Sequence, residues 1–499
     1  MRRLTNTEIN ILETRQRCCS DNWDNILVAD DFETASLRNS GFYGYVRIGE
    51  GAKISDTRII KGSGKRSKAK IISVLNEGGD GNIVLCPALT SQLAYLMMHY
   101  PSVFSLVKTE VEHELESYGG REWTIIGEGC VIEGATKIVD CIISSRQEAP
   151  VYIGPDVIME NSVTACGAIV TDGAKIYESF VGEAAHLGKG FSSEASVFFA
   201  DAYMDNGEAC AALCGPFSCS HHKSTLLIGG QFSFYNAGSN TNQSNHAYKM
   251  GPIHWGIFER GAKTASGCHI LWPAHIGAFS MVMGKLTQHP RIQNLPFSYI
   301  LAGEKTYIVP GINIKTVGTW RDVGKWPKRD VRHEYGKRDL VNFDFPNPYI
   351  IQFVAAAIDL LDTLEAQQGT DAEEYSYEGC FIKRSALVKG RKYYQFAMRL
   401  FGGSVPDDEW IDLCGMLAPK RYIDNLISDI NDGDINSTSE IESTLADIHR
   451  NYEKLAGGRQ DAGAWEEWKR MVMEDARKEY EMGDVTEEQF THFLTSMDN

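Results

Sequence analysis

The chain has 499 residues and a formal net charge of -17, with 49 Lys and Arg against 66 Asp and Glu. This length leaves room for several domains, and the negative charge argues against nonspecific binding to nucleic acid or an anionic membrane, because phosphate neutralisation needs clustered cations. No apolar run reaches the roughly 20 residues that cross a bilayer, and no secretory signal is recognisable. The 12 cysteines form no CxxC pair. We therefore expect a cytoplasmic protein of small-molecule metabolism.

Residues 1–120 predict an N-terminal cap that contains one short β-helix coil and a helical insertion. The repeat-like stretch is Ile48-Gly49-Glu50-Gly51-Ala52. Between Ala88 and Tyr118 apolar residues recur at helical spacing, and Pro101 should divide this run in two. The segment Gly62-Ser63-Gly64-Lys65 is similar to the end of a P-loop, but Ile59 and Arg66 stand where Gly and Ser or Thr are required, which indicates a linker.

Residues 121–345 predict a β-helix with a period of six residues. In each hexad an inward apolar residue is followed, four positions later, by a small or modest one, and nine approximate hexads are difficult to obtain by chance. The pairs are Ile126 with Cys130, Ile132 with Thr136, Ile138 with Ile142, Ile153 with Val157, Met159 with Val163, Val170 with Ala174, Ile176 with Phe180, Val181 with Ala185, and Leu187 with Phe191. The period weakens between Phe198 and Pro252, so we expect irregular coils or a loop there. It resumes with Ile228-Gly229-Gly230-Gln231-Phe232, Ile276-Gly277-Ala278-Phe279-Ser280 and Val282 to Leu286.

Residues 346–499 change to a helical period. Apolar residues from Ile350 to Leu364 fall on one helical face. The segment Asn436-Ser437-Thr438-Ser439-Glu440 predicts a helix N-cap before Ile441. We therefore expect an α-helical C-terminal region.

The hexads resemble those of the hexapeptide-repeat, left-handed β-helix superfamily, which includes acyltransferases of sugars and amino acids, nucleotidyltransferase tails and γ-class carbonic anhydrases. The resemblance implies a mainly β fold, a left-handed parallel β-helix with inserted helices and an α-helical C-terminal domain. It also implies a homotrimer in which a histidine in a cleft between subunits acts as general base. The stretch from Gly229 to Tyr299 is also similar to an uncharacterised bacterial family with a β-helix and a helical tail, and this second resemblance implies no activity.

The polar block between Cys214 and Trp255 contains the candidate site, since it offers few inward aliphatic residues. A near-neutral imidazole can take the proton of an acceptor hydroxyl or amine, and amides can bind an oxyanion. The alternative is that Asn and Ser side chains here satisfy backbone groups in an irregular coil. The predicted catalytic residues are His246, His221 and Asn245, and the predicted substrate-binding residues are His222, Lys223, Tyr235, Asn236, Asn240, Asn242, Lys249, His254 and Trp255.

Two basic segments could bind the phosphates of an acyl-CoA co-substrate, because Lys and Arg bind phosphate and Trp can stack on a base. The alternative is solvated surface, with Pro290 ending the repeat. The predicted cofactor-binding residues are Lys285, His289, Arg291, Trp326, Lys328 and Arg329.

Three functions follow from these patterns. The leading prediction is a transferase that moves an acyl group to a sugar, nucleotide-sugar or amino-acid derivative, working as a homo-oligomer without nucleic acid or membrane partners. The second is a binding or assembly scaffold with structural histidines. The third is a metal-dependent lyase or hydratase, for which His246, His269 and His275 approach but do not match the γ-carbonic anhydrase spacing, so no metal ligand is predicted.

Overall fold

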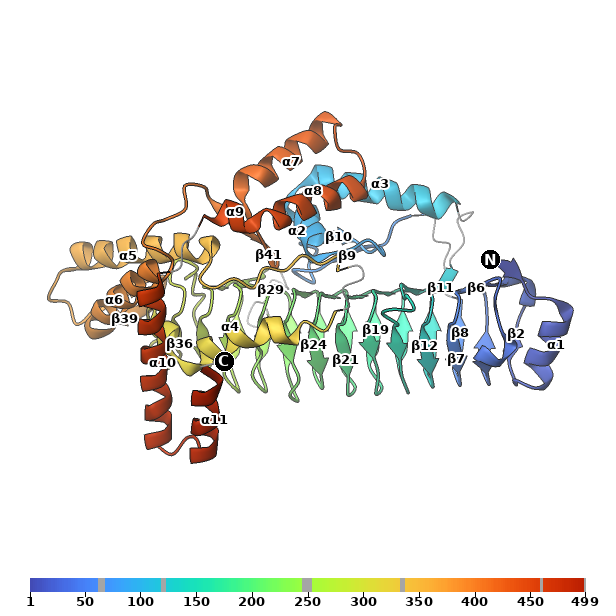
Figure 1. Ribbon diagram of the computed structural model, residues 1–499, viewed down its shortest axis with the longest axis horizontal. Coiled ribbons are helices and arrows are strands. Elements are labelled where there is room, and N and C mark those ends of the chain that lie inside the picture. Colours follow the sequence, from blue (N-terminus) through green and yellow to red (C-terminus); the bar gives the residue numbers. More distant parts are fainter. Residues whose placement is uncertain (62–67, 118–122, 245–253, 333–336, 458–460, 498–499) are drawn as a thin grey trace.

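The computed structural model describes residues 1–61, 68–117, 123–244, 254–332, 337–457 and 461–497. Figure 1 shows one long column of short strands, with helices along one side and at the end that contains the C-terminal elements. No helix among these residues is long and apolar enough to cross a membrane.

Three sheets, named A, B and C here, form the sides of the column. Sheet A contains β1 (Arg2–Arg3), β3 (Ile26–Val28), β6 (Tyr45–Ile48), β11 (Trp123–Ile126), β14 (Ile142–Ile143), β17 (Val163–Thr164), β20 (Phe180–Val181), β23 (Val197–Phe198), β26 (Leu213–Cys214), β29 (Gln231–Phe232), β31 (Ile257–Phe258) and β34 (His275–Ile276). Sheet B contains β2 (Cys19–Ser20), β5 (Gly41–Phe42), β8 (Arg58–Ile60), β13 (Lys137–Val139), β16 (Ile158–Glu160), β19 (Lys175–Tyr177), β22 (Ser192–Glu194), β25 (Glu208–Cys210), β28 (Leu226–Ile228), β30 (Asn242–Ser244) and β33 (His269–Leu271).

Sheet C has two parts, which single bridges from Cys219 to Asn236 and from Asn236 to Lys263 connect. The first part contains β4 (Leu37–Arg38), β7 (Lys53–Ser55), β12 (Val131–Glu133), β15 (Tyr152–Ile153), β18 (Ile169–Val170), β21 (His186–Gly188), β24 (Tyr203–Asp205) and β27 (Cys219–Ser220). The second contains β32 (Lys263–Thr264), β35 (Met281–Met283), β36 (Tyr299–Leu301), β37 (Tyr307–Val309), β39 (Cys380–Lys383) and β38 (Glu374–Tyr377).

The strands wind as coils, because strands of one sheet on successive coils pair in parallel. From β11 to β29 the partner is the strand three places later in the chain. For example, Thr164 pairs with Val181, which pairs with Phe198 on the next coil. The structure is therefore mainly β, with a parallel helical column at its centre. Strands β2 to β8 already belong to the three sheets, so more coils precede residue 121 than the single repeat-like stretch at Ile48 indicates.

The nine inward residues of the predicted hexads are at most 1% exposed and fill the column. Four of their predicted partners were wrong by one position: Ala135, Cys141, Ser162 and Ser179 are buried where Thr136, Ile142, Val163 and Phe180 were expected to point inward. Three of these shifts occur at the corner between sheets B and A. At each of these corners a single residue with a left-handed backbone makes the turn, namely Asp140, Asn161 or Glu178, with φ of 48°, 49° and 47°. This tight corner removes one residue from the hexad.

The predicted loosening after Phe198 was wrong for sheets A and B as far as residue 244, because β23 to β30 continue these two sheets. Sheet C is interrupted there, with only single bridges through Asn236 between β27 and β32. The inward residues there are Met204, Ala209, Cys214 and Phe232, all fully buried. Their varied sizes conceal the period, since a small side chain on one side of the coil is compensated by a large one on another.

Helices cover the column. Their bounds are α1 (Asn6–Thr14), α2 (Ser91–His99), α3 (Pro101–Ser117), α4 (Val317–Arg329), α5 (Pro348–Gln368), α6 (Arg384–Leu400), α7 (Lys420–Asp432), α8 (Thr438–Arg450), α9 (Tyr452–Ala456), α10 (Ala462–Glu481) and α11 (Glu487–Met497), with 3-10 turns at Trp23–Asn25, Thr34–Ser36 and Ile312–Lys315. The break between α2 and α3 lies at Pro101, and Ser437 caps α8 through the backbone N–H of Glu440.

The outer face of sheet A packs against part of these helices. Phe180 and Leu213 from the sheet join one buried apolar cluster with Leu93 of α2, Val103 of α3 and Ile423 of α7. The C-terminal region also contains two hairpins, β38–β39 and β40 (Trp410–Leu413) with β41 (Met416–Pro419), and a further hairpin, β9 (Ile71–Ser73) with β10 (Asn82–Val84), precedes α2. Residues 346–499 are thus mainly, though not only, helical.

Candidate functional site

One outward-facing row of side chains runs along sheet C. Successive coils place His186, Tyr203, Cys219, Asn236 and Lys263 in register with one another. Their strand neighbours, such as Leu187 and Met204, are fully buried in the column. Because side chains alternate across a strand, the row faces away from the core.

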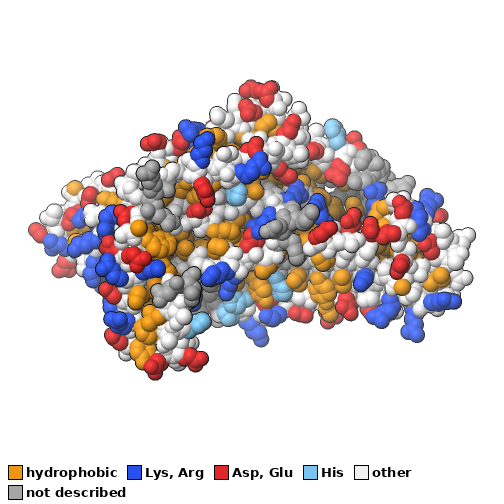
Figure 2. Space-filling model, viewed as in Figure 1, with side chains coloured by type: hydrophobic (Ala, Val, Ile, Leu, Met, Phe, Trp, Pro, Cys, Tyr) orange, Lys and Arg blue, Asp and Glu red, His pale blue; other side chains and the backbone are white. Residues whose placement is uncertain are grey.

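Helix α4 lies across this row (Figure 1), and two cavities of about 670 and 770 Å³ open between the helix and the sheet. His221, Asn236 and Lys263 line both cavities, so we treat the two as one feature, the sheet C groove. In Figure 2, histidine side chains gather with Lys and Arg side chains at the lower middle of the same face. The groove thus concentrates cations and imidazoles on a protein of net negative charge.

His186 forms the best-defined polar pair in the groove wall. Its Nε2 lies 3.4 Å from Oδ1 of Asp205, a carboxylate with no exposed side-chain surface. Lys189 donates to the other oxygen of Asp205 at 2.6 Å, and this hydrogen bond raises the pKa of Lys189. The ring of His186 stacks on that of Tyr203 with a centroid separation of 4.4 Å. The imidazole therefore lies between a buried carboxylate, which it approaches without a hydrogen bond, and an aromatic ring.

Gly188 leaves the space that this pair needs. A Cβ at this position would lie 2.8 Å from Nε2 of His186 and 3.0 Å from Oδ1 of Asp205. The His186 to Asp205 contact thus depends on a residue without a side chain at the end of β21.

His221 occupies the rim shared by the two cavities. Its Nδ1 lies 3.0 Å from Sγ of Cys219, and its ring centroid is 6.4 Å from that of Tyr203. Burial lowers the pKa of His221 and raises the pKa of Cys219. Both shifts favour the uncharged forms, a neutral imidazole beside a neutral thiol.

Cations from sheet C and α4 meet at the centre of the groove. Lys263 and Lys325 both form ion pairs with Asp322, whose side chain is 1% exposed. Arg321, the residue before it, lines the cavity. Burial lowers the pKa of Lys263, while the pairing with Asp322 opposes that shift.

Seven of the residues predicted from sequence line the groove, namely His221, His222, Tyr235, Asn236, Trp326, Lys328 and Arg329. Two of them contribute mainly to packing. Tyr235 is 1% exposed and its hydroxyl is hydrogen-bonded to Thr264 and Gln243 within the column. Trp326 is 6% exposed and packs on Phe234 and Phe279, so it offers little surface on which a base could stack.

Eight other predicted residues line neither cavity, so the structure does not place them with the seven above. They are Lys223, Asn240, Asn242, His254, Trp255, Lys285, His289 and Arg291. Asn242 and Lys285 pair with His269 on sheet B, and Arg291 pairs with His275 on sheet A. Asn240 has a left-handed backbone with φ of 58°, which matches the alternative interpretation of Asn in turns. Sequence proximity misled here because consecutive strands of a coil face three different directions.

The remaining predicted residues, His246, Asn245 and Lys249, lie outside the described residues. Among the residues that are described, no group of three or more metal-ligating side chains is arranged to hold a metal ion. His275 instead lies 2.6 Å from Glu259, which also accepts a hydrogen bond from Tyr349 of α5. This arrangement joins the column to the helical region.

Sequence reasoning missed His186, Tyr203, Asp205, Lys263 and Asp322, whereas Arg321 belongs to the second of the two basic segments that were expected to bind phosphate. The first three belong to regular coils, where outward residues had been assigned no role. Aligning the chain coil by coil, rather than by hexads, would have placed His186, Tyr203 and Cys219 in one row. Asp322 gave no signal, since its partner Lys263 is far away in sequence.

Comparison with known proteins gives two matches. Residues 122–365 match a family model described as a domain of unknown function (DUF4954), and residues 403–457 match another described as a domain of unknown function (DUF6819). No curated protein matches the chain significantly. The first match covers β11 to most of α5, including the sheet C and α4 residues of the groove but not Asp475 and Glu479 of α10, and the second covers the β40–β41 hairpin with α7 and α8.

Proposed function

We propose that the sheet C groove is the site of an acyl transferase that acylates a hydroxyl or amine of a sugar, nucleotide-sugar or amino-acid derivative. The observation that carries this proposal is the pairing of His186 with the buried Asp205 in the groove wall. A buried carboxylate beside a cavity-lining imidazole supports general-base catalysis, because it can orient the imidazole toward a substrate.

His186 acts as the base in this scheme. Asp205 faces Nε2, so it favours the tautomer with the proton on Nε2 and a lone pair on Nδ1. Nδ1 accepts the proton of the acceptor as its oxygen or nitrogen attacks the acyl carbonyl. The new bond to carbon forms, the carbon–sulfur bond of a thioester donor breaks, and the departing thiolate takes the proton back from the imidazole.

The donor in this proposal is an acyl-CoA, bound as a co-substrate. Lys328 and Arg329 at the end of α4 line the same cavity as His186 and supply positive charge for its phosphates. His221, the base predicted from sequence, lies on the neighbouring coil beyond Tyr203. We assign it to the rim, because its Nδ1 contacts Cys219 rather than a carboxylate.

The proposal includes the superfamily's architecture: a left-handed coil and a homotrimer. Parallel pairing of every third strand and an inward row of small and aliphatic residues support it. Analytical ultracentrifugation should give the mass of three 55.5 kDa chains, and a monomer at all concentrations would contradict the trimer without affecting the groove, which one chain builds alone.

The first prediction is that His186→Gln abolishes transfer. We expect a fall in kcat of at least about 100-fold, the usual contribution of a general base, with little change in thermal stability. The measurement is release of free thiol from acetyl-CoA in the presence of a panel of amino sugars, nucleotide-sugars and amino acids. His113→Gln, an exposed histidine on α3, is the matched control.

Two results would contradict this assignment. If wild-type protein transferred acetyl groups and His186→Gln did so at the same rate, the base would lie elsewhere. Comparing His221→Gln under the same conditions then decides between the two imidazoles. If the wild-type protein released no thiol with any acceptor, the acyl-transfer proposal itself would be wrong.

A further inference from the structure

The centre of the sheet C groove holds more positive charge than its carboxylate neutralises. Lys263 and Lys325 share the single carboxylate of Asp322. Arg321 forms no ion pair with any carboxylate of the described residues, and its side chain is exposed to the cavity. Three cations therefore surround one anion. Lys263 lines both cavities, Arg321 lines one of them and Lys325 lines the other.

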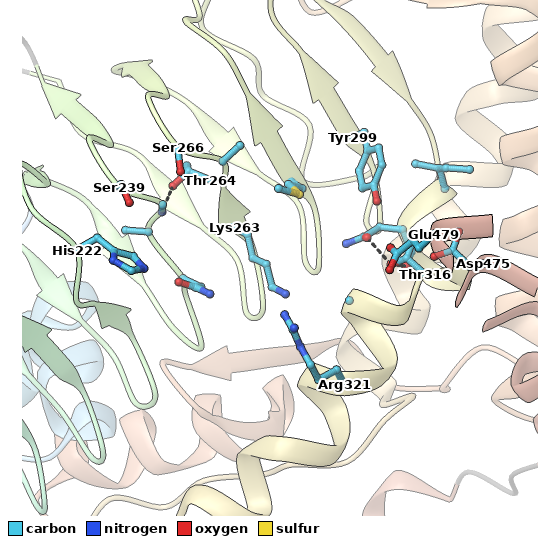
Figure 3. A pocket seen from close by; sticks show the side chains of 18 of the residues that line it. His222, Ser239, Lys263, Thr264, Ser266, Tyr299, Thr316, Arg321, Asp475 and Glu479 are labelled. Carbon is cyan, nitrogen blue, oxygen red and sulfur yellow. Dashed lines mark hydrogen bonds between the residues drawn. The ribbon is translucent and has the colours of Figure 1, made fainter. Parts of the chain in front are cut away.

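The buried carboxylate fixes these cations in place. Asp322 is on the inner face of α4 and 1% exposed, so its two lysine partners cannot move away without leaving an unpaired buried charge. Figure 3 shows Lys263 reaching from its strand and Arg321 reaching from α4 toward the same region of the cavity. The two side chains converge from opposite walls, an arrangement suited to an anion between them.

We propose that Lys263, Arg321 and Lys325, the junction cations, bind a phosphoryl group of an extended ligand. Arg supplies paired N–H donors with the geometry of a phosphate edge, and the lysines supply point charges. The low exposure of Lys263, whose side chain is 14% exposed, strengthens the attraction because less water screens it. The binding claim stands on these contacts, while the identity of the ligand as an acyl-transfer substrate rests on the function proposed above.

The position of the junction cations sets the length of the ligand. Four successive pairings on sheet C lead from His186 through Tyr203, Cys219 and Asn236 to Lys263. Strands in a sheet are about 4.8 Å apart, so these two ends of the row are separated by roughly 19 Å. A ligand that reacts beside His186 and carries its phosphoryl group beside Lys263 must be long and extended, as a phosphopantetheine thioester or a nucleotide-linked sugar is.

Acidic residues at the far end of the groove limit the site on that side. Asp475 and Glu479 of α10 line the same cavity as Arg321 (Figure 3). Asp475 accepts a hydrogen bond from the backbone N–H of Val317 and lies 3.9 Å from Lys315. The phosphoryl group therefore belongs at the junction cations, and the acidic end favours an uncharged or positively charged part of the ligand.

The test uses inorganic pyrophosphate as the probe and the full-length protein. Isothermal titration calorimetry in 50 mM salt should show one binding site in the wild type, with affinity falling as salt rises. Arg321→Gln should weaken binding at least fivefold, and Arg321→Lys should restore part of it. Lys175→Met, which removes an exposed cation from sheet B, should leave the affinity unchanged.

Lys263→Met provides a second arm, with a circular dichroism melt to confirm that it folds. A folded Lys263→Met protein that binds pyrophosphate as tightly as wild type would overturn the proposal. So would absence of pyrophosphate binding by the wild type, or equal binding by Arg321→Gln. If Lys263→Met does not fold, Arg321→Gln alone decides.

The outcome is separable from that of the acyl-transfer proposal. His186→Gln should bind pyrophosphate normally, because His186 is remote from the junction cations. Pyrophosphate binding that depends on Arg321 in a protein without transferase activity would support the phosphoryl site and reject the acyl chemistry. Acyl transfer that is insensitive to Arg321→Gln would support the acyl chemistry and reject the phosphoryl site.

Discussion

At the scale of residues, a buried cluster around Arg332 joins the segment after α4 to sheet A. The guanidinium contacts Asp330 at 2.9 Å, Glu183 at 3.4 Å and Asp201 at 3.5 Å, and its side chain is 5% exposed. Lys337 also contacts Asp330, at 3.0 Å, so two cations face three carboxylates in a largely buried site. Burial accordingly raises the pKa of Asp201 to about 7, whereas hydrogen bonds from Arg332 lower that of Asp330 to about 2 even though burial opposes this.

This cluster predicts that stability falls as pH rises. The pKa of Asp201 is 3.8 ordinarily and about 7 in the folded protein, so the folded state holds a proton that the unfolded state has released between these values, and the stabilisation from it is lost as pH rises through about 7. Asp201→Asn should remove this loss and be more stable than wild type at pH 8 by about 4 kcal/mol, because the two pKa values differ by about 3 and one pKa unit corresponds to about 1.4 kcal/mol. Urea unfolding at pH 5 and pH 8 measures it, and parallel profiles for the two proteins would show that Asp201 is ionised throughout.

At the scale of elements, one face of α4 lines the groove and another face packs against the core. Thr316 caps its N-terminus through the backbone N–H of Thr319. Arg321 and Lys325 project into the groove, while Trp320 packs on Trp468 of α10 with a centroid separation of 4.6 Å. The position of the junction cations thus depends on the packing of a helix from the C-terminal region.

Gly324 is an exposed residue of low helix propensity in this helix. A Cβ there would have no neighbour within 4 Å, so Gly324→Ala should stabilise the protein by about 0.5–1 kcal/mol through helix propensity alone. The change should leave pyrophosphate affinity unaltered. A loss of stability in chemical denaturation would mean that α4 has a conformation in which this position is crowded.

The same scale shows what the sequence could predict. Aliphatic inward residues such as Ile132 and Leu187 made the coils visible, and Pro101 and Ser437 marked helix boundaries by well-understood chemistry. The groove could not be predicted from such local sequence patterns. It combines outward residues from successive coils with a helix more than 50 residues further on, and no short-range pattern encodes which outward face of a coil a distant helix will cover.

At the scale of the whole molecule, Arg260 attaches the β40–β41 hairpin to the column. Its side chain is 3% exposed and donates to Asp412 at 2.8 Å, and to the carbonyl oxygens of Asn342 and Gly415 at 2.9 Å each. The guanidinium also lies over the ring of Phe234, 4.8 Å from its centroid. One side chain therefore connects the regions that match the two family models.

Arg260→Met should destabilise the protein by about 3–5 kcal/mol, because it leaves Asp412 as an unpaired buried charge. The double variant Arg260→Met with Asp412→Asn should recover part of that loss, since the remaining amide carries no charge. The free energies come from urea denaturation followed by tryptophan fluorescence. Equal stability of wild type and Arg260→Met would show that the hairpin is held by apolar packing alone.

The single row of sheet C residues in the groove has a consequence for how such proteins diverge. His186 and Lys263 are at opposite ends of one row, and whole coils separate them. A coil gained or lost between them would leave both ends chemically intact and change their separation by one strand spacing, about 4.8 Å. Ligand length in a column of this kind can therefore change only in discrete increments, through the duplication or deletion of a coil rather than through point substitution.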